Sequence, residues 1–88
     1  MLELFQREEC PACARVRGRL TELGLDFVAR QVPEDPKARE RLETASRQRD
    51  IPVLIDPDHG MVVTEADDII AYLDETYAKL PRRPEGSR

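Results

Sequence analysis

Residues 2–20 read LELFQREECPACARVRGRL, and the middle of this stretch holds both cysteines of the chain, Cys10 and Cys13. The apolar run at residues 2–5 predicts a short strand. Cys10 followed by Pro11 predicts the start of a helix, because proline lacks the N–H that would be unpaired at the first helical position. The cysteine pair is therefore expected where a strand gives way to a helix.

Apolar spacing extends this helix and predicts a strand after it. The spacing of three and four residues that marks one helix face is kept by Cys13, Val16, Leu20 and Leu23. Gly24 suits the C-terminal end of the helix, because glycine adopts the left-handed conformation without strain. Residues 25–32 (LDFVARQV) then predict a second strand.

The middle of the chain predicts a second helix and a hairpin. Asp35 followed by Pro36 opens the helix, whose narrow apolar face is Ala38, Leu42 and Ala45. Residues 51–56 (IPVLID) are an unbroken apolar and β-branched run, which predicts a strand buried on both faces. Residues 56–60 (DPDHG) predict a turn, and residues 61–64 (MVVT) predict the return strand.

A third helix and a tail complete the chain. Thr64 and Asp67 resemble a capping box at the helix start, and the apolar face of the helix is formed by Ala66, Ile69, Ile70, Leu73 and Tyr77. Residues 81–88 (PRRPEGSR) lack apolar side chains and are expected to be a flexible tail after a domain of residues 1–80. The order of elements is therefore β-α-β-α-β-β-α, an α/β fold.

Composition limits the function. The 88 residues fit one domain, and a hydrophobic fraction of 40% supports a packed core. A formal net charge of −4 and a pI of about 5.0 argue against nucleic acid and anionic membranes as partners. The sequence has no apolar run of membrane-spanning length and no signal-peptide pattern at its start, so we expect a cytoplasmic protein. A structural disulfide is not expected in a cytosolic protein, because thiols are kept reduced in the cytosol.

The cysteine pair itself admits several chemistries. A structural zinc site usually needs four ligands, and the chain offers two cysteines and one histidine, His59, so a metal would have to be shared across a dimer. Two buried structural cysteines are a second alternative. A redox pair is favoured, because a Cys10 thiolate would face the unpaired N–H groups of the helix start. Cys13, one turn later, could then attack a mixed disulfide formed at Cys10.

Three stretches resemble the glutaredoxins of the thioredoxin-like superfamily: CPAC at residues 10–13, DIPVL at residues 50–54 and TEADDIIAYL at residues 64–73. The resemblance covers residues 2–78 and implies a thioredoxin-like, glutaredoxin-type fold with a central four-stranded mixed sheet flanked by helices. The last two stretches are also similar to the glutathione transferase N-terminal domain. That second likeness keeps open a binding module without turnover, as an alternative to an enzyme.

The resemblance implies roles for individual residues. Cys10 would be the nucleophile and Cys13 the resolving thiol of a glutathione-dependent oxidoreductase. Its co-substrate would be glutathione, its partners would be disulfide-containing or glutathionylated proteins, and no metal is expected. Ile51-Pro52 matches a cis-proline pair of the family. The glutathione-binding residues that the resemblance implies are Arg7, Pro11, Ile51, Pro52, Ala66 and Asp67.

Three departures from the glutaredoxin pattern concern glutathione binding. Ala12 stands where an aromatic residue is usual, and Asp50 stands where a threonine is usual. Thr64 and Glu65 replace a double glycine before the last helix, although Glu65 fits the transferase pattern. These residues keep two alternatives open beside the enzyme: the binding module and a dimeric metal or iron–sulfur protein.

Overall fold

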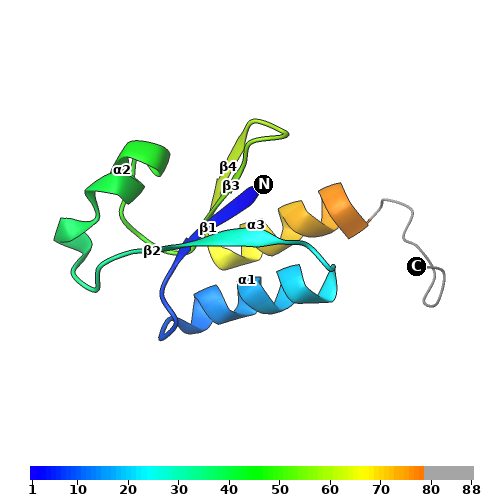
Figure 1. Ribbon diagram of the computed structural model, residues 1–88, viewed down its shortest axis with the longest axis horizontal. Coiled ribbons are helices and arrows are strands. Elements are labelled where there is room, and N and C mark those ends of the chain that lie inside the picture. The colour runs from blue at the N-terminus through cyan, green and yellow to red at the C-terminus, as the bar shows by residue number, and fades with distance from the viewer. Residues whose placement is uncertain (79–88) are drawn as a thin grey trace.

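The computed structural model describes residues 1–78, which form one mixed sheet and its covering helices (Figure 1). The order of elements confirms the order predicted from the sequence. The elements are β1 (Leu2–Gln6), α1 (Pro11–Glu22), β2 (Phe27–Gln31), the 3₁₀ turn η1 (Pro36–Ala38), α2 (Glu40–Ser46), β3 (Val53–Asp56), β4 (Met61–Thr64), α3 (Ala66–Leu73) and the π-helical turn η2 (Asp74–Ala78).

The sheet has the strand order β2-β1-β3-β4. β1 pairs in parallel with β2, as expected when a helix connects two neighbouring strands, and it pairs antiparallel with β3. β3 and β4 form the predicted antiparallel hairpin. The two inner strands are therefore β1, which precedes the cysteines, and β3, which follows Pro52.

α1 and α3 cover one face of the sheet and build the larger core (Figure 1). Leu4 and Leu54 are directly opposite each other on β1 and β3, and both are fully buried on this face. The helices contribute Val16, Leu20, Ile69 and Leu73, all with no exposed surface. This core packs the cysteine-bearing helix against the sheet.

A smaller core lies on the other face, toward α2. Phe5 and Val53, the next opposed pair along β1 and β3, pack there with Val32 and Leu42. Arg41 of α2 lies over the ring of Phe5, with its guanidinium carbon 5.8 Å from the ring centre. β3 therefore has apolar packing on both faces, as its uninterrupted apolar sequence predicted.

Gly24 ends α1 as the sequence predicted. Its φ of +68° is the left-handed conformation, and the Gly24 N–H donates to the carbonyl of Thr21 while the Leu25 N–H donates to that of Leu20. This pair of bonds satisfies carbonyls that the helix end leaves open. β2 consequently begins at Phe27, two residues later than predicted.

The prediction of one helix opening at Asp35-Pro36 is wrong. The Asp35 side chain accepts a hydrogen bond from the Lys37 N–H, but this bond caps only the short turn η1. The α-helix begins later, at Glu40. The break falls at Arg39, whose buried guanidinium donates to the carbonyls of Pro33, Glu34 and Arg49. Ala38 is consequently exposed rather than part of an apolar helix face.

The predicted capping box at Thr64 and Asp67 is also wrong. Thr64 is the last residue of β4, and α3 has Glu65 as its N-cap with no side-chain capping bond. Glu65 has a φ of +70°, so the chain turns sharply between the edge strand and the helix. Asp67 faces α1 instead, where it pairs with Arg15.

Two remaining expectations concern the ends of the chain and the membrane. The predicted tail at residues 81–88, and the last two residues of the predicted domain 1–80, lie outside the described residues. Within residues 1–78, no helix combines the length and apolarity needed to cross a membrane.

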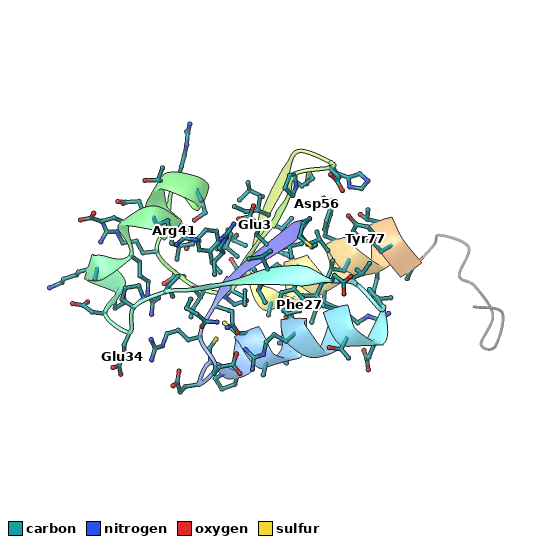
Figure 2. The ribbon with its side chains drawn as sticks, in the orientation of Figure 1. Glu3, Phe27, Glu34, Arg41, Asp56 and Tyr77 are labelled. Carbon is teal, nitrogen blue, oxygen red and sulfur yellow. The ribbon has the colours of Figure 1, made fainter. Side chains whose placement is uncertain are left out.

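Asp56, at the end of β3, joins the hairpin to the C-terminal helical turn. The side chain is 1% exposed, and its Oδ2 accepts hydrogen bonds from Tyr72 and Tyr77 at 2.6 Å each and from His59 Nδ1 at 2.9 Å. Figure 2 shows Asp56 beside Tyr77 at this end of the molecule. Burial acts to raise the pKa of Asp56, but the three hydrogen bonds outweigh it and the pKa lies below its ordinary value of 3.8.

We expect Asp56→Ala to lower the free energy of unfolding by about 2–4 kcal/mol, because it leaves two part-buried tyrosine hydroxyls without their acceptor. Tyr77→Phe should cost about 1–2 kcal/mol. Urea unfolding at neutral pH measures both. A loss below about 0.5 kcal/mol in Asp56→Ala would contradict the assigned role.

The same carboxylate predicts a pH dependence. Because its pKa is lower in the folded state, its contribution is complete above the unfolded pKa and disappears as the pH falls through the folded value. The stability difference between the wild type and Asp56→Asn should therefore narrow below about pH 4. A difference that stays constant from neutral pH to pH 3 would argue against an ionised Asp56.

Candidate active site at the first helix

Cys10 is the N-cap residue of α1, as the sequence predicted. Its backbone is extended, with φ −86° and ψ 113°, and Pro11 occupies the first turn of the helix. The Cys10 Sγ accepts a hydrogen bond from the Cys13 N–H at 3.1 Å. The side chain is half-buried, so its sulfur combines access to solvent with a backbone donor at the positive end of the helix dipole.

Cys13 lies one turn further on and has no exposed surface. Burial raises the pKa of its thiol to about 12, and the hydrogen bond and negative charge of Cys10 act in the same direction. A backbone hydrogen bond from Arg7 and the positive charge of Arg17 act to lower the pKa. At neutral pH Cys13 is therefore a buried, protonated thiol, whereas Cys10 is partly exposed.

A polar network holds the turn between β1 and α1. The Arg7 carbonyl accepts from the Cys10 N–H at 3.2 Å and from Arg17 Nη1 at 3.3 Å. The same guanidinium bonds the buried Gln6 side chain and lies near Glu8. Gln6 in turn donates to Glu8 at 3.1 Å and to Gln31 at 3.0 Å. The position of Cys10 is thus set by side chains from β1, β2 and α1 together.

Arg7, implied by resemblance to bind a carboxylate of glutathione, is engaged within the chain. Its Nη1 donates to the Val32 carbonyl at 3.1 Å, and its Nη2 pairs with Glu9 at 3.2 Å. The side chain is one-quarter exposed. An anionic ligand at Arg7 would therefore have to compete with the Glu9 carboxylate, which is itself largely exposed.

The Ile51-Pro52 peptide bond is cis, as the resemblance implied. It borders a surface hollow of about 260 Å³, whose walls come from the loop before β3, the end of β4 and the residue before α3. The hollow is lined by Gln48, Asp50, Ile51, Pro52, Thr64 and Glu65. The structure thus brings Ile51 and Pro52 together with Glu65, whereas Arg7, Cys10, Ala66 and Asp67 do not line this hollow.

Asp50 carries an unopposed negative charge at the hollow. Its backbone N–H donates to the Gln48 side chain at 2.6 Å, and the Asp50 carboxylate has no hydrogen bond or ion pair within residues 1–78. The adjacent Arg49 is held elsewhere, by Glu43 at 2.7 Å and by the carbonyls of Pro36 and Lys37. Asp50 and Glu65 therefore both add negative charge to the lining.

The two residues at the start of α3 have different surroundings. Ala66 is 7% exposed and packs into the larger core, so its side chain is not available to a ligand. Asp67 is largely exposed and forms an ion pair with Arg15 across the α1–α3 boundary. From the sequence, Arg17 stands out only as one of a local cluster of arginines with Arg15 and Arg19, which suits a small anion. Its place one helical turn after Cys13 is the signal that links it to the cysteines.

No group of three or more His, Cys, Asp or Glu side chains within residues 1–78 is arranged to hold a metal ion. Cys10 and Cys13 are both free thiols.

Comparison with known proteins agrees with the fold. The model of the glutathione S-transferase N-terminal domain family matches residues 4–84. A curated relative from Clostridium pasteurianum is described as an uncharacterized glutaredoxin-like 8.6 kDa protein in the rubredoxin operon. It is 32% identical over 54 residues, which cover 61% of this chain and 72% of that protein.

Solved glutathione transferases share the same architecture over nearly the whole chain. A transferase from Rhodospirillum rubrum superposes with a TM-score of 0.74 and 30% identity, covering 96% of this chain and 39% of that one. A rice transferase in complex with glutathione gives 0.75 and 31%, covering 92% and 35%. The fold is therefore thioredoxin-like, and the chain spans about two-fifths of the length of these transferases.

The difference between the two thiols predicts their order of modification. With iodoacetamide at neutral to mildly alkaline pH, Cys10 should be alkylated at least about tenfold faster than Cys13, because Cys13 is both buried and protonated. Peptide mass spectrometry locates the label, and denaturant should equalise the two rates. Equal labelling of the folded protein would contradict the assignment.

Proposed function

Because the chain belongs to the glutathione S-transferase N-terminal domain family and has a thioredoxin-like fold, we propose that it is a small glutaredoxin-like dithiol oxidoreductase. Its substrates are protein disulfides or glutathione mixed disulfides, and its reductant is glutathione. The proposal includes a cytoplasmic location, where thiols are kept reduced. The observation that carries it is the half-exposed Cys10 sulfur, bonded to the Cys13 N–H at the helix start, with the buried Cys13 thiol one turn behind it.

The first chemical step uses Cys10. Its thiolate attacks one sulfur of a substrate disulfide, so a bond forms between Cys10 and that sulfur while the substrate S–S bond breaks. The other sulfur leaves as a thiolate and takes a proton from water. The Cys13 N–H that donates to the Cys10 sulfur holds this sulfur at the start of α1.

The second step has two routes. In the dithiol route, Cys13 gives up its proton to solvent, attacks the Cys10 sulfur and expels the substrate thiolate, and two glutathione molecules then reduce the Cys10–Cys13 disulfide and become oxidised glutathione. In the monothiol route, a glutathione thiolate attacks the glutathione sulfur of glutathionylated Cys10, which forms oxidised glutathione and releases the Cys10 thiolate. Once Cys10 carries the substrate sulfur, it no longer contributes the hydrogen bond and negative charge that raise the Cys13 pKa.

Glutathione is proposed to bind along the hollow beside Ile51 and Pro52, toward the Cys10 and Pro11 helix start. The start of α3, at Ala66 and Asp67, would receive the γ-glutamyl end through its backbone N–H groups and the Asp67 carboxylate, and Arg7 would receive a ligand carboxylate. Support comes from the family match and from the rice relative, which was solved in complex with glutathione.

A glutathione-binding module without turnover is the second candidate. It is favoured by the match to transferase domains that form about two-fifths of longer chains. The two candidates differ in whether purified protein reduces a disulfide at all.

The roles of the two thiols are tested by Cys10→Ser and Cys13→Ser. Cys10→Ser should abolish reduction of every disulfide. Cys13→Ser should retain reduction of a small glutathione mixed disulfide and lose at least about tenfold in reduction of a protein disulfide. Glutathione-coupled assays on both substrates measure this. Activity in neither assay, with glutathione still bound by the wild type, supports the binding module instead.

Asp50→Thr should improve the use of glutathione. The ligand carries carboxylates, and the Asp50 side chain is exposed and unopposed, so the gain at low salt should be at most about fivefold and should shrink as salt rises. Asp26→Asn is the matched control, because it removes one exposed carboxylate from the turn before β2, which is the edge strand opposite β4. If KM for glutathione is the same in both variants at low ionic strength, the charge of Asp50 does not reach the ligand.

A further inference from the structure

Arg17 has three partners, which lie at the end of β1 and in the turn that carries Cys10. Its guanidinium bonds the Gln6 side chain and the Arg7 carbonyl, and it lies 3.7 Å from the Glu8 carboxylate. The side chain is only 22% exposed. Arg17 also stands four residues after Cys13 on α1, a spacing that puts both side chains on one face of the helix.

The Arg7 backbone connects Arg17 with both cysteines through hydrogen bonds. Its carbonyl accepts from both Arg17 and the Cys10 N–H, and its backbone also makes a hydrogen bond that favours the thiolate form of Cys13. The donor for a thiolate is the Arg7 N–H, which belongs to the peptide unit between Gln6 and Arg7, whereas the Arg7 carbonyl belongs to the next unit. Arg17 bonds both the Gln6 side chain and the Arg7 carbonyl, so it restrains the residues on both sides of the donor that favours the Cys13 thiolate.

We propose that Arg17 is the positioning residue for the resolving step, holding the Arg7 backbone donor and its own positive charge against the Cys13 sulfur while that thiol ionises. The inference deepens the proposed function and rests on it for the meaning of the resolving step. It concerns Cys13 alone, so the attack by Cys10 on substrate and the monothiol route do not depend on it.

The charges around Cys13 allow Arg17 to act in this way. Cys10, at the helix start, opposes ionisation of Cys13 until Cys10 is bound to substrate. Arg17, on the same helix, favours ionisation of Cys13. In the turn, Glu8 partly offsets Arg17, and Glu9 is paired with Arg7. Arg15 points to α3, where it is paired with Asp67, and Arg19 is paired with Glu22 and Asp74. Gln6 and Gln31, from β1 and β2, are neutral.

Arg17→Met tests the proposal with Arg19→Met as the matched control. Both changes remove one arginine from α1, and Arg19 bonds only Asp74 and Glu22, away from the cysteines. Arg17→Lys keeps the charge while losing the planar fork. Circular dichroism and thermal unfolding identify any variant that does not fold. If Arg17→Met does not fold, Arg17→Gln, which keeps hydrogen-bond donors without the charge, carries the test, with the same upward shift expected.

The first readout is independent of activity. In a Cys10→Ser background, ionisation of Cys13 is followed by thiolate ultraviolet absorbance and by the pH dependence of its alkylation. Arg17→Met should move this titration upward by about one pH unit, since a nearby opposite charge shifts a pKa by that order. Arg17→Lys should restore most of the shift, and Arg19→Met should leave the titration in place.

The second readout uses the otherwise intact protein. Arg17→Met should lower protein-disulfide reduction about tenfold at neutral pH relative to reduction of a glutathione mixed disulfide, and raising the pH should recover the loss. Equal loss in both assays with an unshifted titration would assign Arg17 a purely structural role and overturn the proposal. If the wild type reduces neither substrate, the proposed function fails, while the titration still decides whether Arg17 controls Cys13.

Discussion

The hydrogen bond from the Cys13 N–H to the Cys10 sulfur joins the fold of this protein to its chemistry. The first turn of a helix has N–H groups without backbone partners, and here a sulfur atom caps one of them at 3.1 Å. The same contact fixes which sulfur is exposed and which is buried. The larger core secures it from below, because Val16 and Leu20 hold α1 against the sheet.

Arginine–carboxylate pairs determine the charge around this helix start. Arg7 pairs with Glu9, Arg15 with Asp67 and Arg17 with Glu8, and in each pair the carboxylate is the more exposed partner. Exposed pairs of this kind contribute little to stability, but they reduce the positive charge offered to an anionic ligand. Asp50 lacks such a partner within residues 1–78, so the hollow beside Pro52 is more negative than the arginine content of the sequence indicates.

The two faces of the sheet pack against different helices. On the face toward α1 and α3, the larger core holds the cysteine-bearing helix. The buried Asp56 joins the end of β3 to α3 and the turn after it by accepting hydrogen bonds from Tyr72, Tyr77 and His59. Burial and the bond to Asp56 raise the pKa of both tyrosines, which keeps them protonated as donors. The face toward α2 has a smaller core, and α2 itself is positioned mainly through the carbonyl contacts of Arg39.

The sequence by itself determined the order of elements, the helix start at Cys10 and Pro11, the end of α1 at Gly24 and the doubly buried strand β3, because each depends on residues that are close together in the chain. The cis Ile51-Pro52 bond was foreseen only through resemblance. Tertiary structure decided where α2 and α3 begin, since Arg39 finds carbonyls from two separate loops and Glu65 takes a left-handed turn out of β4. It also decided the partners of Arg7, Arg15 and Arg17, because a long charged side chain pairs with whichever carboxylate or carbonyl the packed elements bring within reach.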